Sequence, residues 1–234
     1  MSWTPALPAP EDVRDDERAA YDSVVARQRS YGYTEFVKRF LHEDVLRAFP
    51  GDRLQPYFCA LLNSPLIAAG MSDLGVVYRT RGEFEDGLPH ADREWADLVT
   101  CKELGNNWVI YVHAPDAGAV GVRPEAILAL VQGRDDDLTV DERLKAEFIR
   151  AVARGTMTEQ LYREVEGKLG VRGTVELTCF CGHMLKTKRL QQAFGVPDVT
   201  QEQLEEFLQA IADGRVELPD SKARVPSTQD AVES

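Results

Sequence analysis

The chain has 234 residues and a formal net charge of -12 at neutral pH. This length suits one large domain, or one domain with an arm, and it can bury a core without help from disulfides or metals. Hydrophobic residues make up 44% and charged residues 28% of the chain, which is typical of globular proteins and excludes global disorder. The acidic balance argues against a nucleic acid partner, because phosphate binding requires clustered Lys and Arg.

The sequence also predicts a cytoplasmic protein with no membrane partner. No apolar run approaches the roughly 20 residues of a transmembrane helix, and the first residues lack the basic and apolar segments of a secretory signal. We therefore expect all four cysteines to be reduced. Cys179 and Cys181 form a C-x-C whose side chains would point about 200° apart on a helix, so they do not predict a redox pair or a zinc site.

The hydrophobic pattern predicts helices along the whole chain and no strand. A proline-bearing arm over residues 1–10 precedes a helix at 11–28, and an amphipathic helix at 35–50 follows. Glycine, proline or serine marks most boundaries of the later helices, which are predicted at 54–62, 65–78, 89–104, 106–119, 123–132, 139–154, 158–169 and 172–193. A last helix opens with a capping box at Thr200 and Gln203, and we expect the tail after it to be mobile.

Three segments in this order carry a resemblance to a known family. Residues 91–122 combine a charged start, an apolar helix, a polar step and a helix that carries His113. Residues 123–134 follow as a short helix, and residues 174–196 form a terminal helix that ends at Phe-Gly-Val. Together they resemble the carboxymuconolactone decarboxylase and alkylhydroperoxidase D-like superfamily. The resemblance covers about residues 54–196 and is most specific over 89–133.

The resemblance implies an all-α fold, an alkylhydroperoxidase D-like helical bundle with an additional N-terminal helical arm. It divides the chain into an N-terminal arm with helices at 1–50, a carboxymuconolactone decarboxylase-like domain at 51–196, and a C-terminal helix with a flexible tail at 197–234. Members of this family usually assemble, and apolar residues on more than one stripe of the long helices agree with that, so we expect a homo-oligomer.

In the peroxidase branch of the family, a Glu and a His relay a proton to a C-x-x-C thiolate. Counting back from His113, the positions that match the two cysteines are Asn106 and Val109, and the position that matches the relay Glu is Glu94. Neither Asn nor Val can act as a thiolate nucleophile, so disulfide chemistry at the motif is excluded. Cys101 does not stand at a motif position.

Glu94 and His113 are the motif residues that remain, and the resemblance to the family's decarboxylase branch implies that His113 belongs to the site. An imidazole with a pKa near 6.5 can donate or accept a proton at neutral pH, which suits protonation of a carbanion or enolate after loss of carbon dioxide. His113 is therefore the candidate acid or base and Glu94 its orienting partner. Without the resemblance, the pair would be interpreted as a core histidine and an acidic residue in the first turns of a helix.

Three further residues are candidates for substrate binding. His183 lies on the terminal helix, where the family often carries an aromatic residue or His. Asn106 and Tyr111 have side chains that can bond to a substrate oxygen, although Asn106 is also a candidate helix cap and Tyr111 a candidate packing residue. The basic cluster Lys186, Lys188 and Arg189 either binds a carboxylate or interacts with the helix dipole.

Three functions follow as hypotheses. The first is a lyase, decarboxylase or isomerase that acts on a small oxygenated carboxylate and needs no metal or organic cofactor. The second is a peroxide-reducing enzyme that uses another cysteine, such as Cys101 or Cys181. The third is a non-catalytic binding or assembly protein on the same fold, in which apolar residues around Val109 fill the former pocket.

Overall fold

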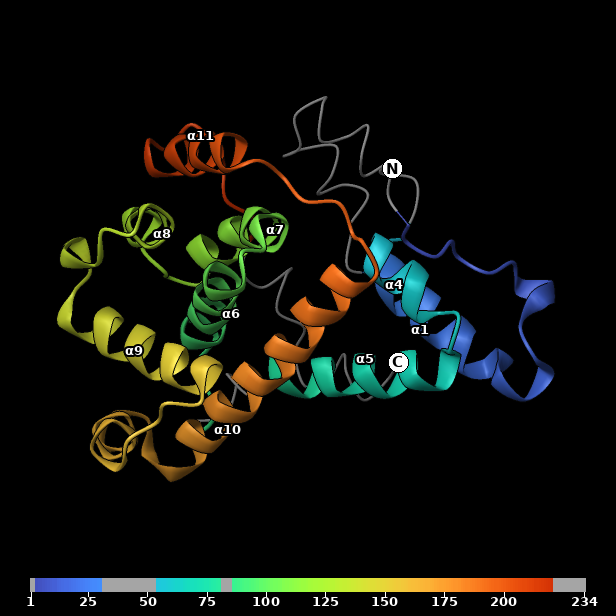
Figure 1. Cartoon of the computed structure of the whole chain (residues 1–234), viewed down its shortest axis with the longest axis horizontal. Helices are drawn as coiled ribbons and strands as arrows, with labels where there is room; N and C mark the ends of the chain where they lie inside the picture. Colours follow the sequence, from blue (N-terminus) through green and yellow to red (C-terminus); the bar gives the residue numbers. More distant parts are fainter. Residues whose placement is uncertain (1–2, 31–53, 81–85, 221–234) are drawn as a thin grey trace. The chain divides into compact units, whose positions relative to one another are not determined.

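A computed structural model describes residues 3–30, 54–80 and 86–220 of the chain (Figure 1). These described residues form helices and loops and contain no strand, which confirms the all-α fold class. The predicted helix at 35–50 and the end of the predicted tail lie outside the described residues. No described helix has the length and hydrophobicity needed to cross a bilayer.

Contacts along the chain define two compact units. Unit 1 consists of residues 1–76 and 190–197, and unit 2 of residues 77–189 and 198–234. Two long helices contribute to both units, α5 (Pro65–Thr80) and α10 (Glu159–Ala193). The domain boundaries expected from the sequence, at residues 50 and 196, stay predictions.

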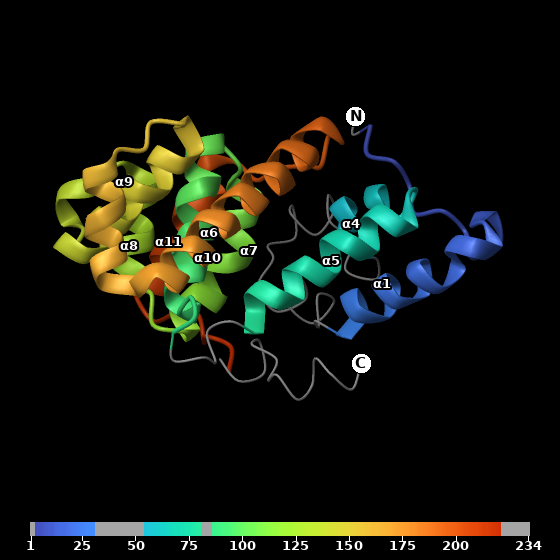
Figure 2. The same cartoon turned by 90° about the horizontal axis from the view of Figure 1, so that it is seen from below.

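Unit 1 contains α1 (Arg18–Ser30), α4 (Pro56–Leu61) and most of α5, which surround a small hydrophobic core (Figure 2). The predicted helix at 11–28 begins later than expected. Its first part forms two 3-10 turns, Pro10–Asp12 and Asp15–Glu17, because Val13 and Arg14 between them have extended backbone. Val13 itself is buried in the core with Tyr21 and Val24.

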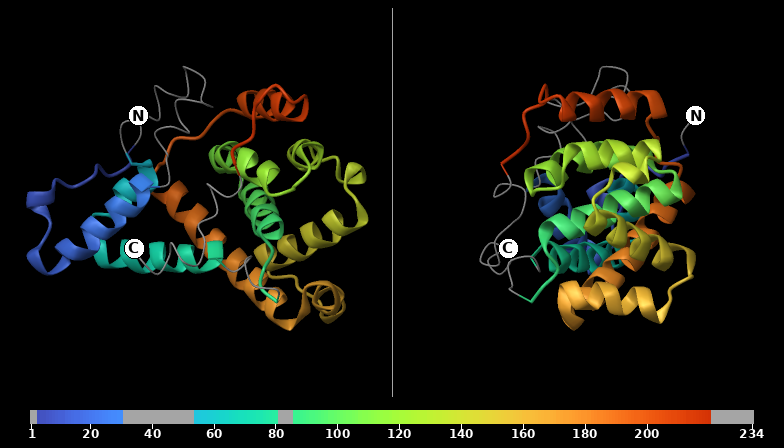
Figure 3. Two further views of the ribbon diagram at one scale, coloured as in Figure 1. Left: turned by 180° about the vertical axis from the view of Figure 1, so that it is seen from behind. Right: turned by 90° about the vertical axis from the view of Figure 1, so that its left-hand side faces the viewer.

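Unit 2 holds the remaining helices, and each lies close to its predicted range. They are α6 (His90–Leu104), α7 (Asn107–Ala119), α8 (Pro124–Gln132), α9 (Val140–Arg154), the main part of α10, and α11 (Gln201–Ala212). A short 3-10 turn at Asp135–Asp137 joins α8 to α9. Helix α6 packs against both α7 and α9, and α11 packs against α7 and α8 (Figure 3).

Local signals in the sequence explain several helix ends. The predicted capping box of Thr200 and Gln203 is present at the start of α11, and a second one, formed by Thr139 and Glu142, starts α9. Gly170 interrupts α10 with φ 67° and ψ 173°, between the two helices that the sequence predicts. Only a residue without a Cβ adopts this backbone conformation readily.

Gly195 offers a test of packing in unit 1. Its φ is 66°, and an added Cβ would lie 2.6 Å from the indole ring of Trp3, whose Nε1 donates a hydrogen bond to the Ala193 carbonyl. We expect Gly195→Ala to lower the free energy of unfolding by about 1–2 kcal/mol from backbone strain and by more from this contact. Urea unfolding followed by circular dichroism measures the loss.

The same substitution in a Trp3→Ala background separates the two causes. Removal of the ring should leave only the backbone strain, so the second Gly195→Ala change should cost less than the first. Equal costs in both backgrounds would show that Trp3 does not pack on Gly195 in solution.

Candidate active site

Helices α6 and α7 position the candidate catalytic residues. Only Gly105 and Asn106 separate the two helices, and Gly105 ends α6 in the left-handed conformation with φ 63°. Because this link is so short, the two helices fold back on one another, and α7 carries His113 past the middle of α6. Glu94, Asp97 and Cys101 are spaced i, i+3 and i+7, so all three lie on one face of α6.

The start of α7 is fixed by two side chains. The Oδ1 atom of Asn106 accepts a hydrogen bond from the backbone N–H of Val109 at 3.1 Å. The Asp198 carboxylate, from the loop before α11, accepts hydrogen bonds from the backbone N–H groups of Asn107 and Trp108. A carboxylate at a helix N-terminus also interacts favourably with the helix dipole. These contacts hold the helix that carries His113.

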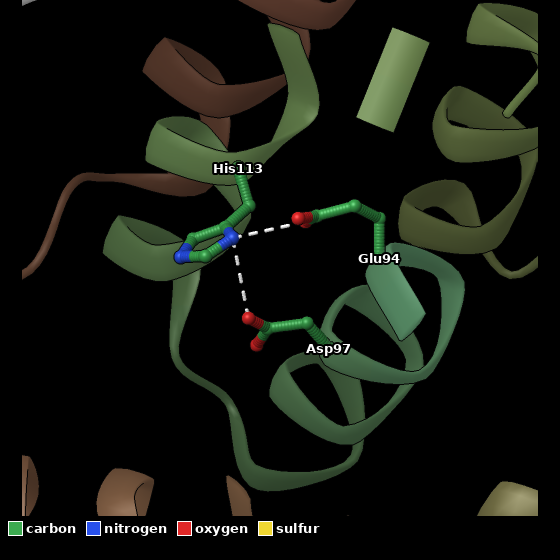
Figure 4. Close-up of side chains that lie close together, drawn as sticks. All are labelled: Glu94, Asp97 and His113. Carbon is green, nitrogen blue, oxygen red and sulfur yellow. Dashed lines mark hydrogen bonds and ion pairs between the residues drawn. The ribbon is translucent and has the colours of Figure 1, made fainter. Parts of the chain in front are cut away.

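His113 lies between two buried carboxylates (Figure 4). Its Nδ1 atom is 3.0 Å from Oε2 of Glu94 and 3.2 Å from Oδ2 of Asp97. Glu94 is 3% exposed and Asp97 1% exposed, whereas the His113 side chain keeps 22% of its accessible surface. The ring atom Nε2 points away from both carboxylates (Figure 4). Nδ1 is therefore fixed by the two carboxylates, and Nε2 faces away from them.

Each carboxylate has a second partner of opposite charge. Oε1 of Glu94 is 2.7 Å from Nη2 of its neighbour Arg93, and Oδ1 of Asp97 is 3.2 Å from Nζ of Lys188 on α10. The Cys101 thiol also donates a hydrogen bond to Oδ1 of Asp97 at 3.2 Å. Both acids thus use one oxygen for a cation and the other for the imidazole, which restricts their rotation.

The charges in this cluster decide its protonation. Burial raises the pKa of Glu94, but Arg93 and His113 lower it more strongly, and the pKa ends well below its usual range. Burial likewise raises the pKa of Asp97, and His113 and Lys188 bring it below its usual value. Burial lowers the pKa of His113, but Asp97 and Glu94 outweigh this effect and raise it. Two carboxylates therefore stabilise an imidazolium.

Glu94, Asp97 and His113 are also residue types that bind metal ions, and one ligand atom from each lies within 4.8 Å of the others. A divalent transition metal accepts such ligands. However, Arg93 and Lys188 already compensate the two carboxylate charges. A divalent ion would add two charges to a buried group that is neutral with a neutral imidazole, which is costly. The charge balance therefore favours a proton at Nδ1.

Two other candidates, Asn106 and Tyr111, lie outside the cluster of Glu94, Asp97 and His113. Asn106 caps α7, as its alternative interpretation predicts. The cap is a hydrogen bond between Asn106 and Val109, the two positions that the resemblance matches to cysteines. Tyr111 is fully buried, and its ring stacks on Phe207 of α11 with centroids 4.1 Å apart. Because Tyr111 is two residues from His113, it projects from another face of α7. A role of either residue in substrate binding stays a prediction.

His183 lies on α10 beside Tyr78, with ring centroids 5.4 Å apart. Its Nδ1 atom is buried and has no hydrogen-bond partner in the part of the chain that the structure describes. Burial and the nearby Lys186 lower the pKa of His183 to about 4, so its imidazole is neutral at physiological pH. No described hydrogen bond or ion pair joins it to the Glu94, Asp97 and His113 cluster, and its role as a substrate ligand stays a prediction.

The cysteines named in the peroxidase hypothesis are unsuited to attack a peroxide. Cys101 and Cys181 are fully buried. Burial raises the pKa of Cys101 well above its usual value, and it raises the pKa of Cys181 to about 12. A reactive cysteine needs an accessible thiolate, which neither residue provides.

Sequence reasoning missed Asp97, Arg93 and the depth of Lys188. The three-residue step from Glu94 to Asp97 was a usable signal, because it places both carboxylates on the helix face that meets α7. The sequence predicts that Lys188 either binds a carboxylate or interacts with the helix dipole, and it gives no sign that the side chain is buried. Its pairing with Asp97 joins residues 91 positions apart and depends on how α10 packs.

Comparison of the chain with protein-family models, curated proteins and solved structures gave no significant match.

The pKa values of His113 and His183 should be shifted in opposite directions from the usual value of a histidine. We expect the midpoint of His113 above the usual 6.5 and that of His183 near 4. Nuclear magnetic resonance of the histidine rings against pH measures both, with His113→Gln and His183→Gln to assign the signals. Similar midpoints near 6.5 would contradict the packing of both rings.

The same shifts have opposite effects on stability. As pH falls from 6.5 toward 4, the unfolded chain binds a proton at His183 that the folded chain does not, so stability is lost. The raised pKa of His113 contributes stability below 6.5, and this contribution disappears as pH rises through that pKa. The His183→Gln protein should therefore lose less stability than wild type between pH 6.5 and 4.

Thiol accessibility tests the peroxidase hypothesis. Cys179 is exposed, so a thiol reagent should modify it in the folded protein while Cys101 and Cys181 stay unmodified until unfolding. Mass spectrometry of digested protein reports which cysteines react. Rapid modification of Cys101 or Cys181, or their oxidation by stoichiometric peroxide with turnover, would instead support thiol chemistry.

Proposed function

We propose that this protein is an acid–base enzyme of the lyase, decarboxylase or isomerase type, which acts on a small oxygenated carboxylate without an organic cofactor. The observation that carries this proposal is the position of His113. Its Nδ1 atom is held by Glu94 and Asp97, and its Nε2 atom faces away from them. A histidine that is only part of a core does not need two buried carboxylates on one nitrogen.

This arrangement allows both directions of proton transfer. When the Nδ1–H group of the neutral ring donates a hydrogen bond to Glu94, Nε2 carries a lone pair and can accept a proton. In the imidazolium form, Nε2 is a proton donor and the two carboxylates stabilise its charge. In a decarboxylation, the C–C bond to the carboxylate breaks and carbon dioxide leaves. The electron pair of that bond remains on the substrate as an enolate. Nε2 then protonates that carbon, and the neutral ring recovers a proton from water.

The charge of the site suits an anionic substrate. With His113 protonated, the two carboxylates, Arg93, Lys188 and the imidazolium sum to one positive charge in a buried cluster. A substrate carboxylate near Nε2 would neutralise it. The resemblance of residues 89–133 to the carboxymuconolactone decarboxylase-like family supports the same chemistry, because Glu94 and His113 stand at its motif positions.

The two alternatives have less support. A cysteine-dependent peroxidase needs an accessible thiolate, and both Cys101 and Cys181 are buried. A non-catalytic assembly protein would not require solvent access at His113, whose side chain is 22% exposed. Assembly into a homo-oligomer is compatible with each hypothesis and stays a prediction.

Solvent deuterium tests the proposed proton transfer. Small β-keto acids and carboxylate-bearing unsaturated lactones are incubated with the protein in deuterated water, and proton resonance detects deuterium at the carbon that is protonated. For any member of the panel that turns over, we expect His113→Gln to lower the rate by about 10²-fold or more, because it removes the acid. Glu94→Gln should lower it less.

His90→Gln is the matched control, since His90 starts α6 but lies outside the cluster. It should keep the wild-type rate, as should wild-type protein treated with a chelator. An unchanged rate in a folded His113→Gln protein would contradict the assigned role of His113. Loss of the rate with chelator alone would show that a metal ion, and not a proton, occupies Nδ1.

A further inference from the structure

Lys188 is among the most deeply buried charged residues that the structure describes. It is 1% exposed, although its sequence context is that of a polar helix end. Its described ion pair is with Asp97, with Nζ 3.2 Å from Oδ1. An unpaired ammonium in such a position would strongly destabilise the folded protein. A hydrophobic residue would pack there more favourably, so the burial of Lys188 calls for an explanation beyond stability.

The charge count of the cluster supplies one. Glu94 and Asp97 contribute two negative charges, and Arg93 and Lys188 contribute two positive ones. The cluster is therefore neutral when the imidazole of His113 is neutral. If Lys188 were absent, the cluster would be neutral only with His113 protonated. Because a buried net charge is expensive, Lys188 opposes the protonation of His113 that Glu94 and Asp97 favour.

Among the residues that the structure describes, no other charged group near His113 has this effect on it. From α6, Glu94 and Asp97 favour the imidazolium, and from α10 Lys188 opposes it. Arg93 and, from α5, Arg79 act on the carboxylate of Glu94. The positive charge of Lys188 acts on His113 itself and lowers its pKa, against the stronger effects of Asp97 and Glu94.

We propose that Lys188 is a positioning residue of the proton-transfer site. The positive charge of Lys188, which is paired with Asp97, lets His113 release its proton and return to the base form. The ammonium also holds Oδ1 of Asp97, so that Oδ2 stays directed at Nδ1. The catalytic meaning of this inference rests on the proposed function, but the charge balance can be measured without a substrate.

The test follows the titration of His113 by nuclear magnetic resonance in variants of the full chain. Lys188→Met should raise the midpoint by about one pH unit or more, because the cluster then becomes neutral only with an imidazolium. Lys188→Arg, which keeps the charge, should return the midpoint toward the wild-type value. Asp97→Asn removes a negative charge and should move the midpoint downward, which gives a second measurement if Lys188→Met does not fold.

Lys145→Met is the matched control. Lys145 is a partly buried lysine that, like Lys188, is paired with an aspartate of α6, in this case Asp92 at 2.6 Å, but it does not reach the cluster. It should leave the His113 midpoint unchanged even if it lowers stability. A midpoint that is unchanged or lower in Lys188→Met, or that moves equally in Lys145→Met, would overturn the inference and leave Lys188 a structural residue.

The results separate this inference from the proposed function. A shifted midpoint in Lys188→Met, together with no effect of His113→Gln on turnover, would support the charge balance and reject the catalytic role. Normal titration in Lys188→Met, together with lost turnover in His113→Gln, would do the reverse.

Discussion

The structure around the candidate site depends on one nitrogen atom. Nδ1 of His113 faces two carboxylates, and each carboxylate is in turn paired with a buried cation. Removal of one partner would change the net charge of this buried cluster, and breaking a buried ion pair typically costs about 3–5 kcal/mol. Helices α6, α7 and α10 each contribute to this cluster, so their packing and the protonation of the imidazole cannot change independently.

The same charge balance makes a divalent metal ion costly at this site. Asn106 and Val109, at the start of α7, are joined by a helix cap. The space between the acids and the imidazole is suited to a proton, because the positive charges of Arg93 and Lys188 already balance the carboxylates. His113 has a side chain that can donate and accept a proton, and its second ring nitrogen is directed away from Glu94 and Asp97.

His113 and His183, both in unit 2, show how different surroundings give the same type of side chain different properties. His113 is surrounded by acids, and its pKa is raised. His183 is surrounded by Tyr78 and lysines, and burial lowers its pKa to about 4. One ring is suited to carry a proton and the other to remain neutral, which is a combination that acid–base sites use.

The sequence by itself determined the helical class and most helix ends, and its resemblance to a family predicts the pair of Glu94 and His113. These features depend on local information, namely hydrophobic spacing, glycine and capping residues, and a motif within 20 positions. The predicted start of α1 was wrong. Two short acidic 3-10 turns stand before this helix with the buried Val13 between them, and such an arrangement leaves no periodic hydrophobic pattern in the sequence. Only the tertiary structure revealed the roles of Asp97 and Lys188. Their ion pair joins distant helices, and the burial that gives it energetic weight exists only when α10 packs against α6.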